Sequence, residues 1–173
     1  MSNVMQRQEK RMKFDAEQLA PLDIDKETKK LLTEKGLPKE ASPFLEFVSS
    51  KGKLTTLCET FELSSRYQHY WFLGTTGAGD PICLHQKNGS VVLLDTSNDD
   101  CERFINTTFP QFLACLDVFE ELVEETIQAN GESAYLERHI PAEVLQRCKK
   151  RMNEIDEACL YKLRKGTSFG FLD

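Results

Sequence analysis

Two short apolar runs joined by an Asn-Gly turn constrain the fold of this chain more than any other feature. Residues 82–85 and 91–94 have the length of β-strands, and Asn88-Gly89 lies between them. Asn-Gly is the strongest short signal of a hairpin, because both turn residues adopt positive φ. The two runs are continuously apolar rather than alternating, so we predict a hairpin of central strands that are covered on both faces.

Further strands are predicted before this hairpin, within a sheet region of residues 44–95. Residues 54–63 place Thr, Leu and Phe in loose alternation, and residues 67–73 are rich in aromatic side chains. Both compositions are typical of strands. Residues 25–35 instead have a helical composition, and Gly36 follows them where a C-terminal glycine cap belongs.

The longest helix signal spans residues 108–127. Thr108 is placed to cap its N-terminus, and Gln111 would complete a capping box. Apolar side chains recur at helical spacing, which predicts one buried stripe. The stripe consists of Phe112, Leu116, Phe119, Val123 and Ile127. A second helical region is predicted over residues 141–165, and Asp156 is placed to cap it partway.

This order of a helix, several strands and two more helical regions predicts an α+β fold. We expect a single, mostly antiparallel (mixed) sheet flanked by helices. At 173 residues the chain suits one domain, which we place at residues 25–173. The polar residues 1–24 are expected to form an arm or a first helix. No apolar run suits a signal peptide or a membrane span, which predicts a cytoplasmic location.

The six cysteines are expected to be reduced and to serve as small core residues. No two of them have the short spacing at which one loop presents two thiolates to zinc. Most lie among apolar neighbours, where a free cysteine behaves as a hydrophobic side chain. We therefore predict no metal site.

The net charge of −6 is concentrated in one stretch of the sequence. Residues 95–125, which we call the acidic window, contain nine carboxylates and a single cation, Arg103, for a charge of −8. Such a segment is either a solvated face or a surface that steers a basic partner. It argues against direct binding of nucleic acid, because phosphates require cations.

Neither the glycine-rich segment nor the histidines predict catalysis. Residues 75–81 include Gly77 and Gly79, but a loop between two strands without a following lysine is a connection rather than a phosphate site. The histidines His69, His85 and His139 are far apart in sequence and lack the spacing of a metal-binding pair. We expect a non-catalytic protein that needs no cofactor.

Several short segments follow one another in a distinctive order between residues 72 and 125. They are Phe72-Leu73-Gly74, Gly79-Asp80-Pro81-Ile82-Cys83-Leu84, Gly89-Ser90-Val91-Val92-Leu93-Leu94-Asp95, Ile105-Asn106-Thr107-Thr108-Phe109 and Gln111-Phe112-Leu113. A weaker continuation is seen in Glu154-Ile155-Asp156-Glu157-Ala158 and Ser168-Phe169. The succession resembles the SUKH superfamily (Smi/Knr-like), and it is most similar to the bacterial immunity proteins of that superfamily.

The resemblance implies an α+β fold and the role of an immunity protein. Such a protein neutralises a toxin from a competing bacterium by binding it inside the cell. Many of these toxins are nucleases, whose basic clefts would suit the acidic window, so we expect occlusion of a basic cleft without any chemistry. The expected contact residues are Asp99, Asp100, Glu102, Glu120, Glu121, Glu124 and Glu125.

Two other functions stay open on the sequence alone. One is a regulatory scaffold of the same fold that binds a host protein instead of a toxin. The other is an enzyme or binding protein for a nucleotide or small molecule, built on the loop from Gly77 to Asp80. Ligand-dependent thermal stabilisation would distinguish this last function from a pure protein binder. The toxin's identity and the oligomeric state do not follow from the sequence.

Overall fold

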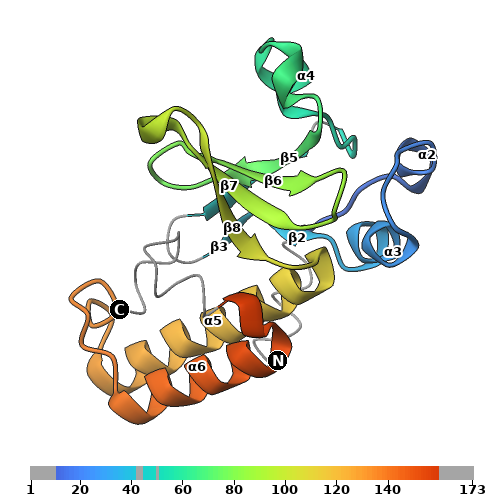
Figure 1. Ribbon diagram of the computed structural model, residues 1–173. Coiled ribbons are helices and arrows are strands. Elements are labelled where there is room, and N and C mark those ends of the chain that lie inside the picture. Colours follow the sequence, from blue (N-terminus) through green and yellow to red (C-terminus); the bar gives the residue numbers. More distant parts are fainter. Residues whose placement is uncertain (1–10, 42–44, 50, 160–173) are drawn as a thin grey trace.

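The computed structural model describes residues 11–41, 45–49 and 51–159, and it has an α+β fold (Figure 1). Its main feature is a six-stranded antiparallel sheet in which each strand pairs with the next one along the chain. In order, the strands are β3 (Glu40–Ala41), β4 (Leu45–Phe47), β5 (Tyr70–Thr75), β6 (Pro81–His85), β7 (Val91–Asp95) and β8 (Cys101–Asn106). Strands β1 (Arg11–Met12) and β2 (Leu37–Pro38) form a separate antiparallel pair. The predicted fold class is confirmed.

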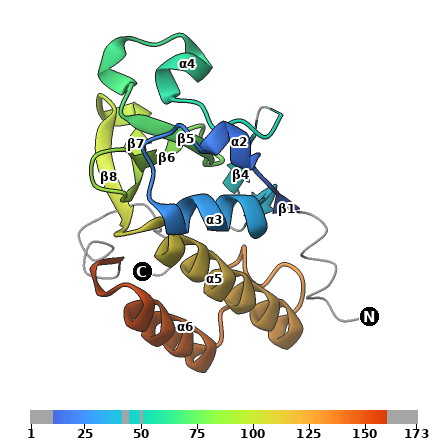
Figure 2. The ribbon, with the colours of Figure 1, turned by 90° about the vertical axis from the view of Figure 1, so that its right-hand side faces the viewer.

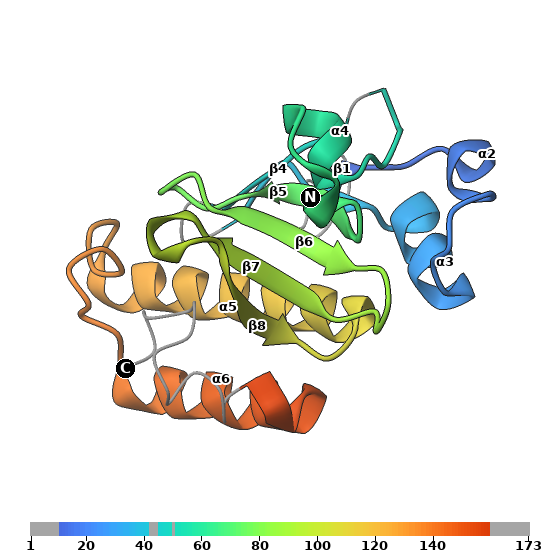
Figure 3. The ribbon, with the colours of Figure 1, turned by 45° about the horizontal axis from the view of Figure 1, so that its top comes forward.

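The helices lie mainly on one face of this sheet. They are α2 (Ala16–Leu19), α3 (Lys26–Glu34), α4 (Leu57–Phe61), α5 (Phe109–Asn130) and α6 (Ala142–Ile155). Helix α5 covers the inner face of the sheet, and α6 packs on α5 from the side away from the sheet (Figure 3). Helix α3 lies along α5 (Figure 2). The outer face carries a smaller core around Phe72, Cys83 and Val92, near α4.

The predicted hairpin is present as β6 and β7, and all five residues of β7 are buried. Its turn differs from the prediction, because only Gly89 has a positive φ, of 72°. The side-chain oxygen of Asn88 instead accepts hydrogen bonds from the N–H and the hydroxyl of Ser90, at 3.0 and 2.7 Å. The hairpin prediction was therefore right for pairing and burial, and wrong for the dihedral angles of Asn88.

The predicted strand over residues 54–63 is wrong, because this segment contains helix α4. A capping box begins the helix: Glu59 N–H donates to the Thr56 hydroxyl at 3.2 Å, and Thr56 N–H donates to the Glu59 carboxylate at 2.8 Å. This local hydrogen bonding outweighs the weak alternation of side chains. The strand predicted at 67–73 is shifted, since a 3-10 turn (Ser65–Tyr67) precedes β5.

Helix α5 begins and ends close to the predicted positions, with Thr108 as its N-cap. The capping box is incomplete, because Gln111 Oε1 accepts the hydroxyl of Thr108 at 2.8 Å rather than its backbone N–H. The amide nitrogen of Gln111 donates to the carbonyl of Ile155 at 2.8 Å. The buried surface differs from the predicted stripe: Val123 and Ile127 are only half-buried, whereas Leu113, Cys115 and Leu122 are buried. A helix placed between a sheet and a second helix must bury two sides.

Asp156 connects the end of α6 to the end of β8. Its buried carboxylate accepts hydrogen bonds from the Asn106 amide at 3.0 Å, and from the backbone N–H and hydroxyl of Thr107 at 2.7 and 3.0 Å. It also accepts the N–H of Ala158 at 3.2 Å, as expected for a residue that caps the chain partway. The predicted helical residues 160–165 and the Ser168-Phe169 motif lie outside the described residues.

The stretch expected to be a polar arm is described only from Arg11 onward. Phe14 and Leu19 are buried in the main core, and the backbone N–H of Phe14 donates to the carbonyl of Leu32 at 3.0 Å. These residues carry the apolar contacts of an otherwise polar segment. Residues 11–24 are therefore packed against the sheet and α3.

Replacing Gly36 by alanine is expected to lower the free energy of unfolding by about 2 kcal/mol or more. Gly36 follows α3 with a φ of 68°, and an added Cβ would lie 2.1 Å from the carbonyl oxygen of Met12. Gly79→Ala is the matched control, since Gly79 also has a positive φ, of 88°, but has nothing within 4 Å of the added Cβ. Urea unfolding followed by circular dichroism measures both losses. Equal losses would show that the contact with Met12 relaxes.

Candidate partner-binding surface

The acidic window is divided between two parts of the fold. Asp95, Asp99, Asp100 and Glu102 lie at the end of β7, in the β7–β8 turn and on β8. The other carboxylates lie on α5, which covers the opposite, inner face of the sheet. The seven expected contact residues come from one stretch of the sequence but belong to these two separate regions.

Three α5 carboxylates form ion pairs with cations from other elements. The pairs are Asp117 with Arg11 (2.8 Å) and Lys35 (2.6 Å), Glu121 with Arg151, and Glu125 with Arg147. The hydrogen bond to Glu121 raises the pKa of Arg151 above its ordinary value. Glu120 and Glu124 lie on the same helix and are half-buried. These pairs offset much of the charge on α5 and join it to α6 and to the N-terminal segment.

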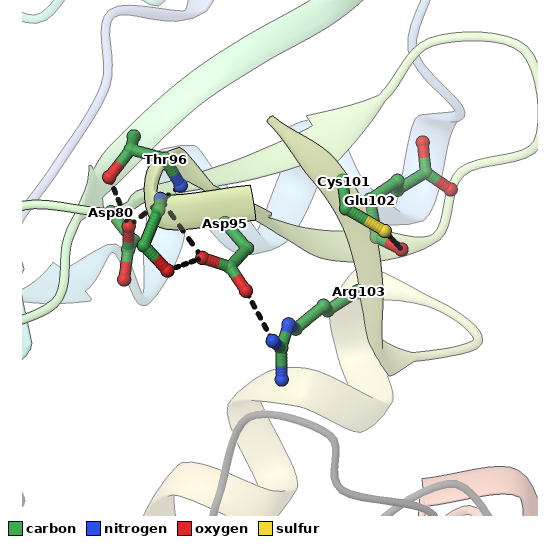
Figure 4. Close-up of polar contacts among 7 residues, drawn as sticks. Asp80, Asp95, Thr96, Cys101, Glu102 and Arg103 are labelled. Atoms are coloured by element: carbon green, nitrogen blue, oxygen red, sulfur yellow. Dashed lines mark hydrogen bonds and ion pairs between the residues drawn. The ribbon is translucent and has the colours of Figure 1, made fainter. Parts of the chain in front are cut away.

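Asp95 is the structural carboxylate of the β7–β8 turn (Figure 4). It is buried, accepts the N–H and hydroxyl of Ser97 at 3.1 and 2.6 Å, and forms an ion pair with Arg103. The hydrogen bonds from Ser97, followed by those from Arg103, hold the pKa of Asp95 below its usual value. Asp80 fixes the same turn by accepting the Thr96 hydroxyl at 2.6 Å. The turn is thus held by two carboxylates, of which Asp95 is buried and Asp80 half-buried.

The remaining carboxylates of this region are exposed, or they accept hydrogen bonds from side chains on the outer face of the sheet. Asp99 is exposed, and its φ of 52° places it in the left-handed region. Asp100 accepts hydrogen bonds from the Arg66 guanidinium, at 2.9 Å, and from the Tyr67 hydroxyl. These contacts fix the direction of Asp100 and offset its charge in part.

Glu102 stands on the outer face of β8 with its side chain partly exposed. It accepts a hydrogen bond from the Tyr70 hydroxyl at 2.9 Å, and the Nε2 of His85 lies 3.9 Å from it. Burial, followed by the hydrogen bond to Glu102, raises the pKa of Tyr70 to about 12. Figure 4 shows Glu102 and Arg103 pointing to opposite sides of the strand. Glu102 is therefore a fixed carboxylate that still faces solvent.

Sequence reasoning missed the side chains that hold these carboxylates. Tyr67, Tyr70 and Arg66 were not predicted as part of the site, although the aromatic run had been noted as a strand signal. Their partners lie more than thirty positions away in sequence, at Asp100 and Glu102. Only the pairing of β5 through β8 brings the two sets together, and β8 itself was not predicted.

The glycine-rich segment is a loop between two strands, and His85 packs against an aromatic ring. Residues between β5 and β6 form a tight connection in which Gly79 N–H donates to the Thr76 carbonyl at 2.9 Å, so the prediction of a connecting loop is confirmed. The ring of His85 packs edge-on against Tyr70, with ring centroids 5.2 Å apart. Within the described residues, no three His, Cys, Asp or Glu side chains are grouped to bind a metal ion.

The cysteines differ in exposure, which predicts a graded reactivity. Cys83, Cys115, Cys148 and Cys159 are buried, as expected, whereas Cys101 is exposed and Cys58 is half-buried. Burial raises the pKa of Cys148 to about 11 and that of Cys83 further. We expect iodoacetamide to modify Cys101 first in the native protein, Cys58 more slowly, and the other four only after unfolding. Mass spectrometry of timed samples measures this order, and early modification of Cys148 would contradict it.

Comparison with known proteins identifies the family. The chain matches the family model described as SUKH-4 immunity protein over residues 5–169. No curated protein and no solved structure matches it. None of the described helices is long and apolar enough to cross a membrane. Since the match covers nearly the whole sequence, the chain belongs to the SUKH-4 immunity protein family.

Proposed function

We propose that this immunity protein neutralises its cognate toxin in the cytoplasm by binding it and covering a basic cleft, without catalysing a reaction. The observation that carries the proposal is family membership over residues 5–169. Charge supports the basic partner, because the sequence has a net charge of −6 that is concentrated in the acidic window. Complementary charge increases association rates and selects partners of the opposite sign. A nuclease is the class of toxin whose active cleft best suits such a surface.

Within the predicted contact residues, the β7–β8 region is best suited to contact a toxin. Asp99 is exposed, and Glu102 is both partly exposed and held in place by Tyr70. A carboxylate with a fixed position loses less side-chain entropy on binding than a mobile one. Asp100 adds a further charge at the same turn. We therefore propose Asp99 and Glu102 as the main electrostatic contact, with Asp100, whose charge Arg66 partly offsets, beside them.

The α5 residues of the prediction contribute less in this proposal. Glu121 and Glu125 each have an arginine of α6 as an ion-pair partner, so their field at long range is partly cancelled. Glu120 and Glu124 stay in the proposed surface as half-buried carboxylates of the same helix. Their contribution requires a toxin large enough to reach from the sheet to α5.

Co-expression with the product of the neighbouring gene tests the proposed function. We expect a stable complex on co-purification at low salt, a weaker complex at high salt, and toxicity of the partner when it is expressed alone. A harmless neighbour that forms no complex would contradict the immunity function for that pair. A complex whose stability does not depend on salt would be consistent with neutralisation but would contradict the electrostatic contact.

A further inference from the structure

A cleft of about 420 Å³ lies on the opposite end of the β6–β7 hairpin from the acidic turn. Its walls come from the segment that enters α3, from the β6–β7 turn and from the start of α5, which Figure 3 shows close together. This volume is within the range of sites that hold a small ligand or a single inserted side chain. The charged and aromatic residues of its wall are Asp23, Asp25, Glu27, Trp71, His85 and Lys87.

The charge of the cleft is negative, and part of it is not offset within the protein. Its lining residues include three carboxylates and one lysine, Lys87. Asp25 caps α3 by accepting the N–H of Thr28 at 2.9 Å. Asp23 and Glu27 are exposed and form no hydrogen bond or ion pair with the described residues. They differ in this from Glu121 and Glu125, whose charges are already paired.

The inner wall of the cleft is apolar and aromatic. Trp71 and Leu84 are 8% and 2% exposed, and both line the cleft. The indole Nε1 of Trp71 is buried and has no hydrogen-bond partner among the described residues. The site combines unpaired carboxylates at its edge with an indole in its wall.

We propose that this cleft receives an arginine side chain from the surface of the toxin. An arginine offers a planar cation whose alkyl stem and guanidinium suit the apolar and aromatic wall, and it donates hydrogen bonds to carboxylates at the edge. Buried arginines are common among the few residues that dominate a protein interface. The inference rests on the proposed function and adds a specific anchor to it, which adjoins the β7–β8 contact where His85 of the cleft wall lies 3.9 Å from Glu102.

The sole tryptophan of the chain makes the cleft directly observable. Protein labelled with 5-fluorotryptophan gives one ¹⁹F resonance, from Trp71. We expect N-acetyl-arginine amide to shift this resonance in a saturable manner, and N-acetyl-citrulline amide, which has nearly the same shape but no charge, to leave it in place. Equal shifts with both compounds, or none with either, would overturn the assignment of a cationic site.

Binding of the toxin by neutralised variants tests the anchor in the complex. Asp23→Asn combined with Glu27→Gln is expected to weaken the complex by about tenfold or more, whereas Glu132→Gln combined with Glu143→Gln is expected to change it less than about twofold. The control is matched, because Glu143 lies in the first turn of α6 as Glu27 does in α3, and both control residues are exposed.

The outcomes separate the anchor from the proposed function. If the unaltered protein binds the toxin and both double variants bind equally well, the cleft is not the anchor and neutralisation stands. If the unaltered protein binds no toxin encoded beside it, the proposed function fails, and the arginine partner fails with it. Loss of binding in the cleft variant alone, with an unchanged unfolding midpoint, supports the anchor.

Discussion

Replacing Asp156 by alanine is expected to lower the free energy of unfolding by about 3–5 kcal/mol. The substitution removes the acceptor for the backbone N–H of Thr107 and for the amide of Asn106. Asn106 is fully buried, and its amide nitrogen would keep only the weak acceptor Cys115 Sγ, at 3.5 Å. It also releases the connection between the end of α6 and the end of β8. Urea unfolding followed by circular dichroism measures the loss.

Asp156→Asn is the control for this prediction. Asparagine keeps the size of the side chain and one acceptor oxygen, so part of the network with Asn106 and Thr107 persists. We expect Asp156→Asn to lower the free energy of unfolding by less than Asp156→Ala does. A loss below about 1 kcal/mol for the alanine variant would mean that water replaces the carboxylate at little cost.

Changing the charge of the β7–β8 turn is expected to slow association with the toxin by about tenfold or more at low salt. The variant combines Asp99→Asn with Glu102→Lys, because asparagine adopts the left-handed φ of Asp99 at less cost than lysine does. The difference from the wild type should shrink as ionic strength rises, since exposed charges are screened. Stopped-flow measurement of the association rate across a salt series tests both statements.

The α5 carboxylates provide the comparison. Glu121→Gln combined with Glu125→Gln removes two charges that are already paired with Arg151 and Arg147. We expect a smaller change in association rate and a modest loss of stability, because exposed ion pairs contribute little each. A larger rate effect from this pair than from the β7–β8 variant would place the contact surface on α5.

The parts of the fold that the sequence predicted are those with strong local signals. The β6–β7 hairpin and α5 have continuous apolar runs or a helical period, with Thr108 and Gly89 at their boundaries. Strand β8 was missed because its first three residues, Cys101 to Arg103, include two charged side chains and lie exposed or half-buried at the edge of the sheet. An edge strand with one uncovered side does not have the continuous apolar pattern of a central strand.

Helix α4 was assigned to a strand although a local signal for it was present. Thr56 and Glu59 have the spacing of a capping box, and they form one. The loose alternation over residues 54–63 predicts a strand, but it is a weaker signal than these two residues. Short helices have too few turns to establish a helical period, so their caps are the more informative feature.

The candidate surface was predictable in composition but not in geometry. The charge of −8 in the acidic window follows from counting residues. Its partial cancellation depends on Arg147 and Arg151, which lie outside the window and face it only because α6 packs on α5. Glu121 and Glu125 are four residues apart, as are the two arginines, and this matched spacing was a signal that two helices could align their charges.

The order of strands in the sheet has a consequence for how the chain acquires its structure during synthesis. Every strand from β3 to β8 pairs with the one made just before or after it, so no strand waits for a distant partner to leave the ribosome. The sheet is complete once Asn106 has emerged, and α5 covers its inner face once Asn130 has followed. Asp156 is synthesised after both, and its hydrogen bond with the N–H of Thr107 then joins the end of α6 to the completed sheet.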